Sequence, residues 1–112
     1  MTKKPRTTLF GRRLQAARLR LGIPQDKLGV AVGLDESCSS TRMSRYETGI
    51  HEPPFTLVEK IAEVLCVPVP YFFCADERLA TILLNYPHLS ETQKNQLLTW
   101  ISTQGTNEIG SP

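Results

Sequence analysis

The sequence predicts an all-α protein, and three observations carry that prediction. Apolar residues recur every three or four positions along most of the 112-residue chain, which is the period of an amphipathic helix. Several of these segments begin or end with residues typical of helix boundaries. No two segments show the strict apolar and polar alternation expected of paired strands. We therefore expect a bundle of short helices.

Glycine and proline mark the limits of the first two predicted helices. The first begins at Leu9 and ends before Gly22, a residue typical of the position after a helix. The second starts at Pro24, which can occupy a first helical position, and closes at Gly33. The polar stretch 34–38 is expected to be a loop.

Three more elements complete the first part of the chain. Ser39 is expected to cap a third helix that runs through Thr48. A capping box that begins at Thr56 predicts a fourth helix, which ends near Cys66. The apolar, proline-marked segment 67–73 is expected to form one helical turn over the core.

Two further helices are predicted near the carboxyl end. One runs from Asp76 until Pro87 stops it, and a capping box that begins at Ser90 starts another, which ends near Gly105. Four parts are therefore expected: a basic arm at 1–8, a helical domain at 9–75, a two-helix extension at 76–104 and a frayed tail at 105–112.

Charge is distributed unevenly, although the net charge is only +2. Residues 1–27 hold eight basic residues and one acid, a net +7, and the remainder holds five basic residues and ten acids, a net −5. A basic segment suits a polyanionic partner such as nucleic acid, because neutralising phosphates contributes much of the affinity. A solvated basic face is the alternative on charge alone.

Several classes of protein are not expected. The longest apolar run is broken by two prolines and is far short of the ~20 residues that cross a bilayer, and no export signal is evident. We expect a cytoplasmic protein. The three cysteines show no zinc-ligand spacing, so buried or inert thiols are expected, with no metal and no cofactor. Neither a nucleophile with a nearby histidine nor a phosphate-binding glycine loop appears, so the chain is not expected to be an enzyme.

A set of short motifs lies in one order between Leu9 and Phe73. They are Gly22-x-x-Gln25-x-x-Leu28, Met43-Ser44-Arg45-Tyr46-Glu47-x-Gly49, Pro53, Ile61-Ala62 and Leu65-x-Val67-Pro68. In this order they resemble the lambda-repressor-like (Cro/Xre) helix-turn-helix family. The resemblance implies a five-helix domain that binds specific double-stranded DNA, usually as a transcriptional repressor or regulator of prophage or mobile-element type.

The third predicted helix has two different faces. Hydroxyl and arginine side chains fall on one face, whereas Met43, Tyr46 and Ile50 fall on the other, which should meet the core. The predicted base contacts are Ser40, Thr41, Ser44 and Arg45. Arg45 comes first, because its planar fork matches the O6 and N7 atoms of guanine; the alternative is an ordinary exposed arginine.

Other residues are expected to contact the DNA backbone. The resemblance gives this role to Gln25 and Thr48, and Arg42 and His51 are further candidates. The arm residues Lys3, Lys4 and Arg6 could follow the backbone or enter a minor groove, or make no contact. The resemblance also implies a structural ion pair between Arg18 and Glu47.

Two departures from the family pattern are evident. Pro24 stands where a hydroxyl cap is usual. About four extra residues between Gly33 and Met43 enlarge the turn, which leaves the docking angle of the third helix open. Asp35 and Glu36 in this turn would be repelled by phosphates, so they should point away or move on binding.

A short helix contacts few base pairs, so a homodimer is expected, with the extension as the candidate dimer surface. Packing of the extension on its own domain is the alternative. A second possible function is that of an antitoxin, which would regulate its own operon and hold a toxin through the same helices.

Overall fold

The computed structural model describes residues 7–109 and, within the last helix, side chains as far as residue 104. The predicted arm residues Lys3, Lys4 and Arg6 lie outside the described residues. The α-helices are α1 (Leu9–Arg20), α2 (Gln25–Ala31), α3 (Ser39–Thr48), α4 (Phe55–Leu65), α5 (Glu77–Asn85) and α6 (Glu91–Ile109), and the 3-10 helices are η1 (Val69–Phe73) and η2 (Tyr86–His88). The described part contains no strand, so the predicted all-α class is confirmed.

One core joins the first four helices and η1. Its fully buried apolar side chains come from all five elements: Leu14, Leu28, Met43, Ile61, Leu65 and Phe72. Helix α5 contributes only Ala80 to the fully buried set, and Leu83 and Leu84 pack partly against it. The core therefore fixes α1 to α4 firmly and holds α5 at its edge.

Of the three predicted N-terminal caps, one is right and two are wrong. The Ser90 capping box forms, because Gln93 N donates to Ser90 Oγ (3.1 Å) and Ser90 N donates to Gln93 Oε1 (2.9 Å). Ser39 does not cap α3; Cys38 holds that position, and Ser39 is the first helical residue. At α4 the helix begins one residue before Thr56 and has no side-chain cap. At the end of α3, Gly49 adopts a left-handed conformation with φ of 84°, which is common for a glycine after a helix.

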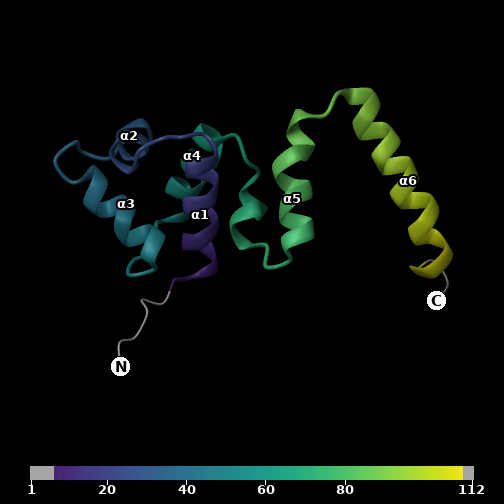
Figure 1. The fold of residues 1–112 in the computed structure, drawn as a ribbon, viewed down its shortest axis with the longest axis horizontal. Coiled ribbons are helices and arrows are strands. Elements are labelled where there is room, and N and C mark those ends of the chain that lie inside the picture. The colour runs from purple at the N-terminus through teal and green to yellow at the C-terminus, as the bar shows by residue number, and fades with distance from the viewer. Residues whose placement is uncertain (1–6, 110–112) are drawn as a thin grey trace.

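Helix α6 extends away from the rest of the molecule (Figure 1). It does not stop at Gly105 as predicted but continues to Ile109, because one glycine weakens a helix without ending it. None of its described side chains is fully buried. The radius of gyration of 17.1 Å exceeds the ~13 Å of a compact 100-residue domain, in agreement with this extended shape.

The cysteines differ from expectation in one respect: none is fully buried, since Cys38 and Cys74 are half-buried and Cys66 is exposed. Among the described residues, no group of three or more His, Cys, Asp or Glu side chains is placed to hold a metal ion. Within 7–109, no helix combines the length and the apolar character that a membrane span requires.

Candidate nucleic-acid interface

Helices α2 and α3 pack tightly because small residues meet at their contact. A Cβ atom added to Gly29 would lie 1.9 Å from Ser39 Oγ, so only glycine fits there without a shift. Ser39 is fully buried, and its hydroxyl donates to the Asp26 carbonyl oxygen at 2.6 Å. This use of the hydroxyl explains why Ser39 does not act as a cap: it links the two helices instead.

The enlarged turn between these helices is held by its own hydrogen bonds. Leu34 N donates to the Gly29 carbonyl (2.9 Å), and Cys38 N donates to the Asp35 carbonyl (3.1 Å). The Asp35 carboxylate accepts from the Ser37 hydroxyl and from Ser37 N, and these bonds lower the pKa of Asp35. The extra residues therefore form an ordered turn while α3 keeps its contact with α2.

The inner face of α3 is locked into the domain. Met43 and Tyr46 are buried there, as predicted. Ile50 was assigned to the same face, but it is 67% exposed. The left-handed turn at Gly49 ends the helix before Ile50, so the helical spacing no longer applies to it.

The outer face of α3 carries the predicted base-contact residues. Ser40, Thr41 and Arg45 are exposed, and Ser44 is half-buried. Successive turns of the helix bring these four residues to one side, because positions three and four apart are neighbours. Thr48 lies at the end of this face, and its hydroxyl already donates to the Ser44 carbonyl at 3.0 Å.

Arg42 lies at the border of the two faces and has a partner within the helix. Its guanidinium donates to the Tyr46 hydroxyl at 2.8 Å and lies 6.0 Å from the centre of the Tyr46 ring. The bond to Tyr46 raises the pKa of Arg42. Arg42, Arg45 and His51 line a shallow hollow beside α3. His51 N donates to the Arg45 carbonyl at 3.2 Å, which holds the following loop beside this hollow.

A buried ion pair joins α1 to α3. Arg18 Nε lies 2.5 Å from Glu47 Oε2, and Arg18 Nη2 donates to Glu47 Oε1 at 3.1 Å. Both side chains are nearly inaccessible to solvent, with 8% and 3% exposed. Arg18 also donates to the Ile23 carbonyl at 2.9 Å. The pair therefore fixes the end of α3 against the turn that follows α1.

Two residues take part in this junction in ways that the sequence did not indicate. Gln25 Nε2 donates to Glu47 Oε1 at 3.0 Å, so the side chain predicted to contact phosphate also supports the ion pair. A Cβ atom on Gly11 would lie 2.2 Å from the Glu47 carbonyl oxygen, so α1 and α3 approach each other at a glycine. A glycine inside an otherwise helical pattern is the signal that could have revealed this close approach.

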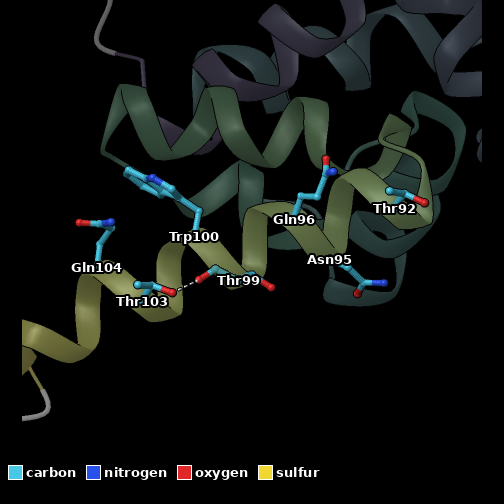
Figure 2. Close-up of a pocket in the computed structure, with 7 residues that line it drawn as sticks. All are labelled: Thr92, Asn95, Gln96, Thr99, Trp100, Thr103 and Gln104. Atoms are coloured by element: carbon cyan, nitrogen blue, oxygen red, sulfur yellow. Dashed lines mark hydrogen bonds between the residues drawn. The ribbon is translucent and has the colours of Figure 1, made fainter.

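A second exposed surface of different chemistry lies on α6. Its open side is lined by Thr92, Asn95, Gln96, Thr99, Trp100, Thr103 and Gln104 (Figure 2). Trp100 is 63% exposed and Leu98 is 60% exposed. From Asn95 to Gln104 the helix carries no charged residue. This surface is neutral and partly apolar, whereas the outer face of α3 carries hydroxyl groups and arginines.

Comparison with known proteins identifies the arrangement of α1 to α4 and η1. A family model described as a helix-turn-helix domain matches residues 9–70. The chain belongs to this helix-turn-helix family. The crystal structure of the transcriptional regulator BswR superposes on 83% of this chain and 92% of its own, with a TM-score of 0.80 and 40% sequence identity.

Two curated relatives agree with this helix-turn-helix assignment. Each is described as an uncharacterized HTH-type transcriptional regulator, one from Sinorhizobium medicae and one from Rhizobium meliloti. Each is 32% identical over 63 residues, which cover 56% of this chain. The matched segment spans 42% of the length of these relatives. The similarity to them thus covers about half of this chain and less than half of each relative.

Proposed function

We propose that this helix-turn-helix protein regulates transcription by binding specific double-stranded DNA as a homodimer, with α3 in the major groove. The observation that carries the proposal is the division of α3 into a locked inner face and an exposed face of hydroxyl and arginine side chains. An α-helix fits the major groove, where each base pair presents a distinct pattern of donors and acceptors. A repressor of prophage or mobile-element type is the expected kind of regulator.

Sequence recognition is assigned to the outer face of α3. Arg45 is exposed and can donate two parallel hydrogen bonds to one guanine. Ser40, Thr41 and Ser44 are small, so the helix backbone can approach the base edges closely. Their hydroxyl groups donate or accept, which suits several bases.

Backbone contacts would set the register of the protein on the duplex. Gln25 is in the first turn of α2, where backbone N–H groups favour anions. Arg42, on α3, and His51, in the loop after it, are both exposed to solvent. Thr48 would have to release its hydrogen bond to Ser44 before donating to a phosphate, so it contributes least.

The homodimer is assigned to α5 and α6. The exposed large apolar side chains of α5, α6 and the intervening η2 are Leu79, Ile82, Tyr86, Leu98, Trp100 and Ile101. None of the described side chains of α6 is fully buried, so burial of its apolar residues against a partner would stabilise the helix. A second copy suits it, because the neutral stretch 95–104 lets two α6 helices meet without like-charge repulsion. Dimers of this class bind half-sites about 34–36 Å apart.

Selection of duplexes from a random pool tests the proposal. The wild-type protein should enrich symmetric, paired sites. Arg45→Ala should relax the preference at one base position and cost about 1–3 kcal/mol at sites that carry the preferred base. Lys60→Ala, which removes an exposed basic residue of α4 outside the proposed DNA and dimer surfaces, is the control and should select the same sites as wild type.

Two results would contradict the proposal. Enrichment of no duplex by the wild-type protein would refute DNA recognition altogether. If Arg45→Ala weakens binding to every duplex equally, Arg45 is a backbone contact and its assignment to a base is wrong.

A further inference from the structure

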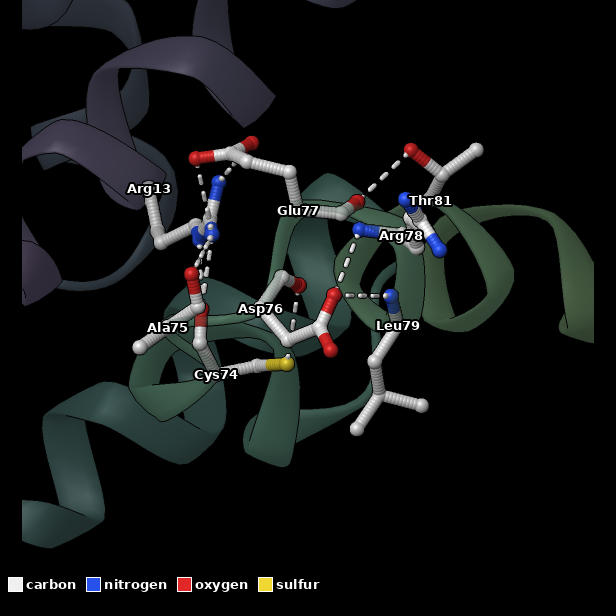
Figure 3. A network of polar contacts seen from close by, with 8 residues as sticks. All are labelled: Arg13, Cys74, Ala75, Asp76, Glu77, Arg78, Leu79 and Thr81. Atoms are coloured by element: carbon white, nitrogen blue, oxygen red, sulfur yellow. Dashed lines mark hydrogen bonds and ion pairs between the residues drawn. The ribbon is translucent and has the colours of Figure 1, made fainter.

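Arg13 occupies the junction between the helix-turn-helix domain and the carboxyl-terminal extension. Its side chain is 9% exposed. Nε and Nη2 donate to the Cys74 carbonyl oxygen at 2.9 and 2.7 Å, and Nη2 lies 3.5 Å from the Ala75 carbonyl oxygen. Nη1 and Nη2 also donate to the two carboxylate oxygens of Glu77, at 3.1 and 3.3 Å (Figure 3). One guanidinium therefore binds the linker and the first turn of α5 together.

The chemistry of this contact requires arginine. A guanidinium is planar and presents its donors in a fixed fork, so it can meet two carbonyl groups and a carboxylate at once. The Tyr71 ring lies beside it, 5.6 Å from the guanidinium carbon, and helps to hold its orientation. A lysine has one ammonium group on a flexible stem and cannot reproduce the fork.

The other contacts of α5 are less directional. Ala80 is buried against the core, and Leu83 and Leu84 are partly buried there. Apolar burial depends on area and not on direction, so it allows a helix to tilt or slide. Asp76 accepts hydrogen bonds from Arg78 N and Leu79 N and so caps α5 itself, without linking it to the domain. Arg13 thus supplies the directional hydrogen bonds between α1 and the start of the extension.

Helix α1 connects the two functional surfaces. Gly11 and Arg18 contact Glu47 of α3, and they share one side of α1 because they are seven residues apart. Arg13 is two residues from Gly11, about 200° around the helix axis, and so faces the opposite side. Figure 1 shows α1 between α3 and α5. A change at Arg13 would therefore alter the direction of the extension relative to α3.

We propose that Arg13 is a positioning residue that sets the spacing of DNA half-sites. By fixing the start of α5 against α1, and through α1 relative to α3, it influences the distance between the two α3 helices of a dimer. This inference rests on the proposed function, because spacing is defined only for a dimer that binds paired sites.

The test uses the full chain with Arg13→Lys or Glu77→Gln. Glu77→Gln is the milder change, because Glu77 is 78% exposed and the carbonyl contacts of Arg13 remain. Glu59→Gln is the matched control, since it alters an exposed glutamate of α4 outside the proposed DNA and dimer surfaces. Duplexes are selected from a random pool, the spacing of enriched half-sites is recorded, and affinities for single and paired sites are measured.

The wild type and Glu59→Gln should enrich one spacing. Arg13→Lys should enrich several neighbouring spacings. Its preference for paired over single half-sites should fall roughly tenfold, because a less firmly placed second α3 has a lower effective concentration at its half-site. Glu77→Gln should broaden the spacing less, and affinity for a single half-site should stay within about twofold in all variants, because α3 is unchanged.

Other outcomes separate the two proposals. Wild-type spacing in both variants would overturn the positioning role while leaving the proposed function intact. An equal loss of single-site and paired-site affinity would also overturn it, since that pattern reports general destabilisation. If the wild type enriches no paired sites, the proposed dimer fails and the inference fails with it. If Arg13→Lys does not fold, the spacing selected by Glu77→Gln tests the proposal by itself.

Discussion

Helices α3 and α6 both expose side chains to solvent, but they differ in how they contact the rest of the molecule. The inner face of α3 is buried and bonded to its neighbours through Ser39 and Glu47, whereas none of the described side chains of α6 is buried. The exposed side chains differ as well, since those of α3 are hydroxyl and basic and those of the stretch 95–104 of α6 are neutral and partly apolar. Exposure alone does not indicate a partner, but the chemistry of the exposed side chains does. It favours a polyanion for α3 and a protein surface for α6.

The two helices also differ in what stabilises them. Helix α3 is ten residues long and depends on packing and on the ion pair beneath it. Helix α6 is nineteen residues long and has a complete capping box at its start. Because long, capped helices form more readily than short ones, α6 can extend from the domain, whereas α3 requires the domain. Changes at the two helices should therefore have different consequences.

The largest effect is expected from Glu47→Ala. The substitution leaves Arg18 charged and buried without its carboxylate partner, which should cost about 3–5 kcal/mol of the free energy of unfolding and abolish DNA binding through unfolding. Thermal unfolding followed by circular dichroism measures it. The control Glu91→Ala removes an 86% exposed partner on α6 and should leave the midpoint nearly unchanged. An unaltered midpoint for Glu47→Ala would show that the pair does not hold α3.

The next effect is expected at the contact of α2 with α3. Gly29→Ala should destabilise the domain by about 1–3 kcal/mol, because the new methyl group overlaps Ser39 Oγ. The cost should be smaller in a Ser39→Ala background, where that oxygen is missing. Denaturant unfolding of the two single variants and the double variant measures this coupling. Equal costs in both backgrounds would argue against the close approach.

A different kind of effect is expected on α6. Trp100→Ala should leave the unfolding of the helix-turn-helix domain unchanged but weaken dimerisation by about 2 kcal/mol, as truncation of a central interface tryptophan does. Sedimentation equilibrium measures the dissociation constant. Leu19→Ala is the control, because Leu19 is 60% exposed on α1, outside the proposed interface. A wild-type dissociation constant for Trp100→Ala would exclude this face of α6, and a toxin would then become the better candidate for its occupant.

The smallest effect is expected when the pH is lowered, and it concerns the turn at Asp35, with the capping box of α6 as the comparison. Hydrogen bonds from Ser37 lower the pKa of Asp35 below its ordinary value of 3.8. The ionised carboxylate therefore stabilises the turn fully above that value, and this contribution is lost as the pH falls through the lower pKa of the folded state. The amide shift of Ser37, followed by NMR, should titrate with Asp35. The Ser90 and Gln93 capping box has no titratable group and should stay constant; parallel changes in both turns would indicate general unfolding instead.

Much of the fold could be predicted from local patterns. Gly22, Gly33 and Gly49 marked helix ends because each has a positive φ, which glycine adopts without strain. Helical spacing identified the buried face of α3 through Met43 and Tyr46. The same spacing failed at Ile50, because the backbone turn at Gly49 breaks the helical period. The roles proposed for the residues on the outer face of α3 await the DNA experiments.

Local sequence by itself determined which segments form helices and which side of each helix is apolar, because both depend on residues within a few positions of one another. Only the tertiary structure decided how these surfaces are used. It assigned Ser39 to a buried link, gave Gln25 a place beside the ion pair, and directed Arg13 to the linker 61 residues away. Such contacts join atoms that are distant in the chain, so they depend on the packing of whole helices and not on the spacing of neighbouring residues.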